Sequence, residues 1–217
     1  MARLLAVSKQ QQPHAIRALA AQGQRAFGEN YVQEAVAKQA ALAGGDGAQP
    51  LPELEWHLIG HLQSNKAADA ARAFDWVQSV DRPRLVEALA RHRPADRTRL
   101  NVLIQVNIDD EASKHGCAPG AVDALADAVA GQPRLALRGL MAIPAPHADP
   151  ALRPRAFAAM RGLFDALAAR HPGVDTLSMG MSADYVQAIQ VGATMVRVGS
   201  ALFGARRQDA GPGTRDA

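Results

Sequence analysis

The sequence predicts a single α/β domain folded as a closed (β/α)8 barrel. Short apolar runs alternate eight times with amphipathic or alanine-rich segments, and this alternation indicates a parallel sheet with right-handed crossovers. The chain has 217 residues, 48% of them hydrophobic, which suffices for a barrel at the short end of its size range. An open doubly wound sheet is the alternative, but no G-x-G-x-x-G motif follows an early strand.

The predicted strands are short apolar runs bounded by polar residues, glycine or proline. The first covers residues 3–9 and ends at Lys9, just before the polar stretch 10–13. The clearest is residues 101–108, with the sequence Asn-Val-Leu-Ile-Gln-Val-Asn-Ile. The other predicted strands are residues 26–29, 54–60, 76–80, 137–143, 175–179 and 193–198.

The segments between the strands are predicted helices, because their apolar residues recur at helical spacing and alanine favours the helix. The predicted helices are residues 14–22, 31–42, 65–74, 82–91, 119–130, 152–170 and 183–191, with a short last helix from residue 200. Residues 44–52 are rich in glycine and proline and are predicted to form a loop. We expect residues 1–205 to form the barrel and residues 206–217 to be a disordered tail with little to bury.

Composition excludes several classes of protein. The formal net charge is +3 and the pI is about 9.4, but Lys and Arg are scattered, so a nucleic-acid partner is not expected. Cys117 is the single cysteine, which leaves no intrachain disulfide and no Cys-based zinc site, and we predict no metal site. No signal-peptide pattern and no apolar stretch of about 20 residues is present, so we expect a soluble cytoplasmic protein without a membrane partner.

Lys9 is the first candidate for a functional residue. It ends the first strand, and a barrel builds its site at the carboxyl ends of its strands. A lysine there is either an exposed cation or a desolvated amine that condenses with an aldehyde as a Schiff base.

Glycine and serine residues after the seventh and eighth strands form a candidate phosphate site. Ser178-Met179-Gly180-Met181-Ser182 ends the seventh strand, and Gly199-Ser200 opens the last helix. Barrels often bind phosphate here, where glycine lets the backbone approach and a helix N-terminus attracts an anion. The alternative is that these are turn glycines and a serine cap.

Four further polar residues lie near the predicted strand ends. Arg197 interrupts an apolar strand, where a charge is costly unless paired, and we favour an orientation into the barrel mouth over one between the helices. Asn30 either binds a ligand or caps the next helix. His57 is either a general base or, as we favour, a buried histidine bonded to a backbone carbonyl. Lys114 is a solvated loop lysine or a second cation over the mouth.

An aldehyde-reactive lysine, a phosphate cradle and an arginine near the ring position together fit pyridoxal 5′-phosphate (PLP). The lysine would hold the aldehyde and the cradle the phosphate. Arg197 would face the pyridine nitrogen and, because arginine stays protonated, would keep that nitrogen unprotonated.

Six stretches of the chain resemble one known family, the pyridoxal-phosphate homeostasis proteins of the YggS/PROSC group. They are Leu-Leu-Ala-Val-Ser-Lys at 4–9, Phe-Gly-Glu-Asn-Tyr at 27–31, Trp-His-Leu-Ile-Gly at 56–60 with Leu-Gln-Ser-Asn-Lys at 62–66, Arg-Gly-Leu-Met at 138–141, Ser-Met-Gly-Met-Ser at 178–182 and Val-Arg-Val-Gly at 196–199. Together they are highly specific, although each alone is weak.

The resemblance implies a PLP-binding barrel of the alanine racemase N-terminal domain type. It implies that Lys9 is the Schiff-base lysine and that Arg197 faces the pyridine nitrogen. The remaining cofactor-binding residues that it implies are Asn30, Ser178, Met181, Gly199 and Ser200. Members of the group are thought to bind, buffer and deliver PLP rather than to catalyse a dedicated reaction. The resemblance therefore implies PLP-requiring apo-enzymes as partners and a monomeric protein. Lys114 matches a family lysine proposed to act in PLP transfer.

The chain departs from the family pattern in four places, two of which are the Ala183-Asp184-Tyr185 stretch, less acidic than is typical, and a tail without the lysines of some relatives. The family normally has a helical stretch before the lysine strand, so we expect the lower barrel to have less support here. His61 replaces a proline usual in the Gly-Pro-Leu-Gln-Ser-Asn-Lys run.

Two other functions stay open. A PLP-dependent amino-acid racemase would need a second base, usually a tyrosine from a separate domain or subunit. Tyr31 and Tyr185 are the only tyrosines, and no second domain is expected after residue 205, which argues against this reading. A barrel that binds another phosphorylated metabolite, with Lys9 purely electrostatic, is the third reading.

Overall fold

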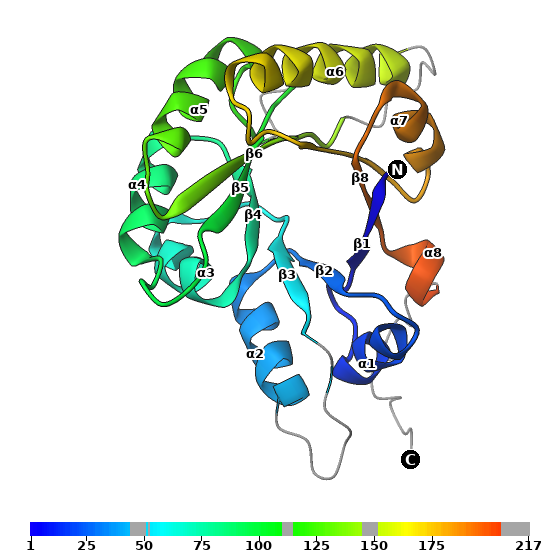
Figure 1. The fold of residues 1–217 in the computed structure, drawn as a ribbon. Helices are drawn as coiled ribbons and strands as arrows, with labels where there is room; N and C mark the ends of the chain where they lie inside the picture. Colours follow the sequence, from blue (N-terminus) through cyan, green and yellow to red (C-terminus); the bar gives the residue numbers. More distant parts are fainter. Residues whose placement is uncertain (44–50, 52, 110–114, 145–151, 205–217) are drawn as a thin grey trace, which may run out of the picture.

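The chain forms a closed barrel of parallel strands surrounded by helices (Figure 1). A computed structural model describes residues 1–43, 51, 53–109, 115–144 and 152–204. Within these residues eight strands follow one another around the barrel in sequence order, and β8 closes it by pairing with β1. The predicted (β/α)8 barrel is therefore confirmed.

The strands are short and most of their residues are buried. Their bounds are β1 (Arg3–Val7), β2 (Ala26–Glu29), β3 (Glu55–Leu58), β4 (Trp76–Val80), β5 (Leu100–Gln105), β6 (Leu135–Met141), β7 (Thr176–Met181) and β8 (Met195–Val198). β1 ends two residues earlier than predicted because a turn begins at Ser8, whose carbonyl accepts a hydrogen bond from Gln11. β7 continues to Met181, two residues further than predicted.

A helix or helical turn follows each strand and covers the barrel from outside. The α-helices are α1 (Pro13–Ala21), α2 (Val32–Ala43), α3 (Ala67–Ala73), α4 (Pro83–His92), α5 (Val122–Ala130), α6 (Leu152–Arg170), α7 (Tyr185–Val191) and α8 (Ser200–Phe203). Short 3-10 turns, η1 (Ser64–Lys66) and η2 (Pro119–Ala121), lead into α3 and α5. None of the described helices is long and apolar enough to cross a bilayer.

The main hydrophobic core lies between the strands and the helices. Alternate strand residues point to opposite faces, so residues such as Ala6 and Phe27 join this layer together with helix residues such as Phe157. Trp76, Leu103 and Met141 form a separate cluster. Another separate group is Leu5, Ala26, Ile59 and Met195. Four strands, β3, β4, β7 and β8, also carry buried polar side chains that belong to the candidate site: His57, Gln78, Ser178 and Arg197.

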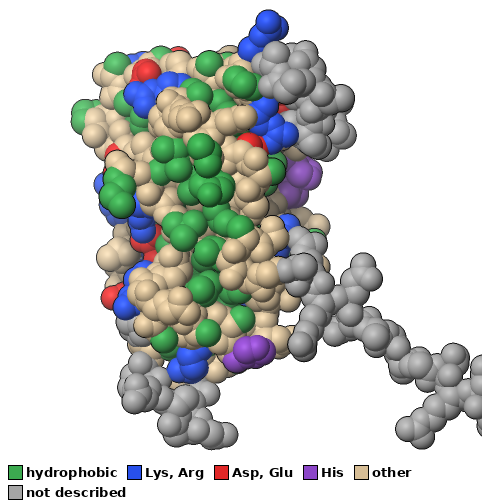
Figure 2. Space-filling model, turned by 90° about the vertical axis from the view of Figure 1, so that its right-hand side faces the viewer, with side chains coloured by type: hydrophobic (Ala, Val, Ile, Leu, Met, Phe, Trp, Pro, Cys, Tyr) green, Lys and Arg blue, Asp and Glu red, His purple; other side chains and the backbone are tan. Residues whose placement is uncertain are grey.

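One face of the barrel is more apolar than a closed shell of helices would leave it. Figure 2 shows a strip of hydrophobic side chains on the side where β1, β8, α7 and α8 lie. The exposed large hydrophobic residues of these elements are Leu4 of β1 and Tyr185, Val186 and Ile189 of α7.

Three sequence-based predictions concern residues outside this description. The predicted loop at 44–52 is described only at Leu51, and the predicted tail at 206–217 is not described. Lys114 also lies outside the described residues, so both readings of it stay predictions.

Candidate functional site

The turn after β1 holds Lys9 in a constrained backbone. Gln11 N donates a hydrogen bond to Ser8 O at 3.0 Å, which closes the turn around Lys9 and Gln10. Gln10 has φ of 60°, and among the described residues no other non-glycine residue has a positive φ. Such a conformation is costly for a side chain with a Cβ and persists only where the surroundings enforce it. Lys9 itself is half-buried, and its amine has no hydrogen bond or ion pair with any described residue.

A buried ion-pair network holds both neighbours of Lys9. Lys38 Nζ lies 2.8 Å from Glu29 Oε1 and 2.7 Å from Glu34 Oε1, and it donates to Ser8 O at 2.6 Å. Ser8 Oγ donates to Glu29 Oε1 at 2.6 Å, and Gln10 N donates to Glu34 Oε1 at 2.5 Å. Ser8 and Gln10 are thus fixed by side chains of β2 and α2.

Burial dominates the electrostatics of this network. Burial raises the pKa of Glu29, while hydrogen bonds from Lys38 and Ser8 oppose the rise. The side chain of Glu29 is fully buried and that of Lys38 is 7% exposed, so each charge depends on the other. The network therefore acts as a rigid support for the turn that carries Lys9.

A chain of hydrogen bonds crosses the barrel interior from β8 to β3. Arg197 Nη1 donates to Ser178 Oγ at 2.8 Å, and Ser178 Oγ donates to Gln78 Oε1 at 2.7 Å. Gln78 Nε2 donates to His57 Nδ1 at 2.9 Å, and His57 Nε2 lies 2.6 Å from Glu55 Oε1. Because an amide nitrogen only donates, Nδ1 of His57 accepts and its Nε2 carries the proton. Every link therefore donates in one direction, from the guanidinium towards the carboxylate.

Arg197 is buried inside the barrel without a counter-charge. Arg197 is 3% exposed, and its Nη2 donates a hydrogen bond to Ala142 O at 2.8 Å. Burial lowers the pKa of its guanidinium to about 10. No carboxylate pairs with Arg197 among the residues described here, and a buried cation without one is unusual.

His57 is a buried structural histidine, but the predicted partner is wrong. It is fully buried and stacks on Trp76, with ring centroids 5.1 Å apart and an interplanar angle of 11°. Its two nitrogens are bonded to the side chains of Gln78 and Glu55 and not to a backbone carbonyl. Gln78 comes from the adjacent strand β4 and Glu55 from β3 itself, two residues before His57, because alternate strand residues point to the same face.

We expect acid to destabilise the protein through His57. Burial lowers the pKa of His57 below its ordinary 6.5, although Glu55 opposes this shift. As the pH falls through about 6.5, the unfolded chain therefore gains a proton that the folded chain does not, and the free energy of unfolding decreases. Proton NMR should show His57 ring shifts that stay constant as the pH falls from about 8 to 6 in the folded protein. The same ring should titrate in urea, and titration in the folded state at the unfolded value would contradict the expectation.

The turns after β7 and β8 lie next to each other. Ser200 Oγ is 3.4 Å from Ser182 Oγ, at an exposed position. Gly180 has φ of +91°, and a Cβ there would lie 2.5 Å from Ala188 Cβ, so only glycine fits this turn. Met181 N donates to Asp184 Oδ1 at 2.6 Å. The structure thus brings the two predicted halves of the phosphate site together.

The predicted phosphate residues differ in accessibility. Ser178 is fully buried and its hydroxyl already bonds Gln78 and Arg197. Ser200 is exposed and Gly199 is half-buried. Ser182 belongs to the predicted phosphate run 178–182, although not to the residues that the family resemblance implies, and it lies beside Ser200.

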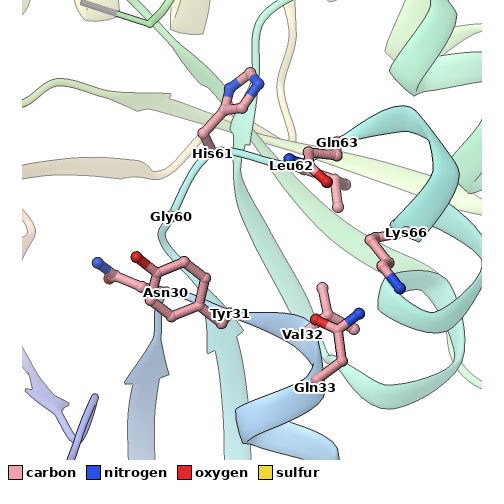
Figure 3. Close-up of a pocket in the computed structure, with 9 residues that line it drawn as sticks. All are labelled: Asn30, Tyr31, Val32, Gln33, Gly60, His61, Leu62, Gln63 and Lys66. Carbon is pink, nitrogen blue, oxygen red and sulfur yellow. The ribbon is translucent and has the colours of Figure 1, made fainter.

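Asn30 lines a pocket on another part of the rim. Figure 3 shows Asn30 and Tyr31 facing His61 and Lys66 across it. The pocket measures about 290 Å³ and lies between the segment after β2 and the segment after β3. Gly60 permits this arrangement, because a Cβ there would overlap the backbone of Asn30.

Comparison with known proteins assigns the family. A family model described as "Alanine racemase, N-terminal domain" matches residues 1–207. The chain is 54% identical to the pyridoxal phosphate homeostasis protein of Pseudomonas aeruginosa, over 94% of this chain and 84% of that protein. The chain belongs to the pyridoxal phosphate homeostasis protein family. The Escherichia coli K12 member of this family is 49% identical over 94% of this chain and 85% of its own length.

Solved structures place this homeostasis protein family on the same barrel. PipY of Synechococcus elongatus, solved with PLP bound, superposes with a TM-score of 0.82 at 39% identity. The match covers 94% of this chain and 92% of the PipY chain. Alanine racemase from Corynebacterium glutamicum has a TM-score of 0.67 at 20% identity, which shows the shared fold alone.

Sequence reasoning missed the two hydrogen-bonded networks that support the candidate site. Gln78 is a polar residue inside a buried apolar strand, and that signal indicates an interior partner. Lys38 shares the buried face of α2 with Ala35 and Leu42, and a lysine in this position indicates a buried carboxylate.

Proposed function

We propose that this chain binds PLP and acts in PLP homeostasis, as the names of its relatives indicate for them. The observation that carries the proposal is Arg197, a fully buried guanidinium without a carboxylate partner in the described chain. A cation so placed is costly unless a ligand supplies an acceptor. The ring nitrogen of PLP is such an acceptor, and an arginine opposite it favours the unprotonated pyridine.

The residues of β1 and β8 fit the two ends of this cofactor. β1 and β8 are paired neighbours, with Leu5 opposite Arg197, so Lys9 and Arg197 belong to adjacent strands of the barrel. When bound, PLP supplies an aldehyde that condenses with a primary amine. The amine of Lys9 has no partner among the described residues and stands in a turn that two carboxylates and a lysine immobilise.

The phosphate would lie at the adjacent turns after β7 and β8. Gly199 and Ser200 would contribute backbone N–H groups, since the first amides of a helix lack partners within it. From the β7 side, Met181, whose N–H donates to Asp184, would line the phosphate site, and Ser182 would offer its hydroxyl. We propose that Ser178 contributes through Arg197, which it fixes by a hydrogen bond, and that Asn30 lines the site from the end of the neighbouring strand β2.

The proposed role is that of a carrier of PLP without a dedicated reaction. The curated relatives are named for homeostasis, and the racemase structures share no more than the fold with this chain. We propose that PLP-requiring apo-enzymes receive the cofactor and that the protein acts as a monomer. A cytoplasmic location is also proposed, because Cys117 is a free thiol whose pKa burial raises to about 11.

Replacement of Arg197 tests this proposal by separating PLP binding from stability. We expect the Arg197→Met protein to retain about tenfold less PLP after dialysis than the wild type, because the ring nitrogen loses its donor. The change removes a buried charge but also the hydrogen bonds to Ser178 Oγ and Ala142 O, so the two effects oppose each other and the free energy of unfolding of the PLP-free protein should change by less than about 1 kcal/mol. Urea unfolding and the absorbance of bound PLP measure the two effects.

Arg93 provides a matched control, since it is also a buried arginine, at 2% exposure. Its guanidinium donates to the carbonyls of Ala71, Phe74 and Thr98, which marks a structural role. Arg93→Met should lower the free energy of unfolding by about 1–3 kcal/mol and leave PLP binding by the folded protein unchanged. Loss of stability without loss of PLP in Arg197→Met would overturn the proposed role of Arg197.

A further inference from the structure

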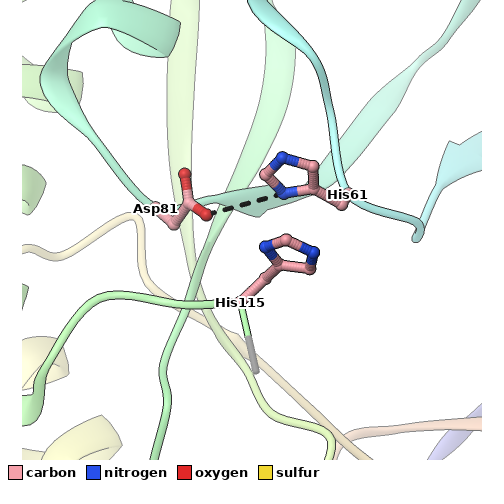
Figure 4. Close-up of side chains that lie close together, drawn as sticks. All are labelled: His61, Asp81 and His115. Carbon is pink, nitrogen blue, oxygen red and sulfur yellow. Dashed lines mark ion pairs between the residues drawn. The ribbon is translucent and has the colours of Figure 1, made fainter. Parts of the chain in front are cut away.

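Three potential metal ligands meet at the rim of the barrel. His61 follows β3, Asp81 directly follows β4, and His115 precedes the bridge that Cys117 forms after β5. These are consecutive strands, and the carboxyl ends of parallel strands lie at one rim. Figure 4 shows the three side chains converging there from three separate segments.

The distances between the donor atoms suit a shared ion. One ligand atom from each residue lies within 4.8 Å of the other two. His61 Nδ1 is 3.8 Å from Asp81 Oδ2, and the rings of His61 and His115 stack with centroids 3.6 Å apart. Bonds of about 2.0–2.2 Å to a zinc ion place ligand atoms about 3.3 Å apart, so small movements complete the site.

The rings have the freedom for this movement. They lie at an interplanar angle of 15°, and nearly parallel stacked rings do not direct their lone pairs at one point. Rotation about the Cβ–Cγ bond corrects this. Both histidines are exposed residues, so their rings turn without disturbing the core.

Asp81 is the fixed member of the group. Its side chain is 9% exposed, and Arg82 Nη1 is 2.5 Å from its Oδ1. Arg82 also donates to Leu62 O at 2.9 Å, which ties the segment after β3 to the segment after β4. Oδ2 remains directed at His61, and an outer partner that orients a ligand in this way is typical of metal sites.

The ligand atoms suit a transition metal. Neutral imidazole nitrogen and carboxylate oxygen are both ligands that a zinc-type ion accepts, and the cluster offers two of the first and one of the second.

We propose that His61, Asp81 and His115 bind a divalent transition-metal ion of the zinc type, with a fourth position open to solvent. Two imidazoles and one carboxylate select such an ion over Mg²⁺ or Ca²⁺, which prefer ligand sets made of oxygen. The site lies on the β3–β5 side of the rim, whereas Lys9 and Arg197 belong to β1 and β8. The proposal therefore does not depend on PLP binding.

Titration of tag-free, chelator-treated protein with Zn²⁺ tests the proposal. Calorimetry should give one ion per chain, and Co²⁺ as a probe should produce the visible absorption of a nitrogen- and oxygen-ligated site. His61→Asn and His115→Asn should each weaken Zn²⁺ binding by about tenfold or more. His14→Asn changes an exposed histidine of α1 outside the cluster and should leave binding unchanged.

The pH dependence supplies a second readout. Zn²⁺ affinity should fall as the pH is lowered, because protons then compete with the metal ion for the imidazole nitrogens. Absence of Zn²⁺ binding, or binding that both His61→Asn and His115→Asn retain at full strength, would overturn the proposal. The Lys9→Ala protein should bind Zn²⁺ normally, so failure of the PLP proposal would leave this test readable.

Discussion

Lys9→Ala is expected to abolish the covalent attachment of PLP. When the wild-type protein is incubated with PLP and reduced with borohydride, mass spectrometry should locate the cofactor on the peptide that contains Lys9. The variant should carry no cofactor at this position and should lose the visible absorbance of bound PLP. Lys9 has no hydrogen bond or ion pair with the described residues, so its removal should change the free energy of unfolding by less than about 0.5 kcal/mol.

Lys66→Ala is the matched control for this experiment. Lys66 is a half-buried lysine that lines the pocket beside Asn30, on a different part of the rim. The Lys66→Ala protein should attach PLP to Lys9 to the same extent as the wild type. Attachment that persists in Lys9→Ala, or a wild-type protein that carries the cofactor only on other lysines, would refute the role of Lys9 and bring other phosphorylated ligands forward.

The fold was readily predicted because each strand is locally distinct. A strand such as Leu100–Gln105 is a run of apolar residues between polar segments, and its burial on both faces leaves this signal in the sequence. The same local signals single out Lys9 and Arg197 as candidates, since Lys9 ends an apolar run and Arg197 interrupts one. The errors at the strand ends have local causes as well, such as the turn that stops β1 at Val7.

The support of the site was not predictable because its partners are far apart in the sequence. Gln78 and Ser178 are 100 residues apart and meet across the barrel interior. The cluster of His61, Asp81 and His115 combines residues from three separate segments, so no spacing pattern announces it. Closure of the barrel brings such residues together, and sequence periodicity carries no information about which of them meet.

Lys38→Met is expected to cause the largest loss of stability among the substitutions considered. The change leaves Glu29 fully buried without its counter-charge, and breaking a buried ion pair in this way costs about 3–5 kcal/mol. Without Lys38, burial and the nearby Glu34 raise the pKa of Glu29 and only the hydrogen bond from Ser8 opposes them, so this pKa rises further in the folded protein. A raised folded pKa gives stability that is present at low pH and lost as the pH rises. The deficit measured by urea unfolding should therefore be smaller near pH 5 than near pH 8.

The double variant Glu29→Gln/Lys38→Met separates the lost charge pair from lost packing. It should recover a substantial part of the stability of Lys38→Met, because an uncharged amide costs less to bury than a lone carboxylate. Arg161→Met serves as the exposed control. The side chains of Arg161 and Asp165 are 40% and 53% exposed, so their ion pair contributes about 0.5 kcal/mol or less to the free energy of unfolding. Lys38 also donates a hydrogen bond to Ser8 O and so helps to hold the turn that carries Lys9. The Lys38→Met protein that remains folded should therefore attach PLP to Lys9 more slowly than the wild type. Unchanged stability together with an unchanged rate of attachment would show that the network does not support the turn.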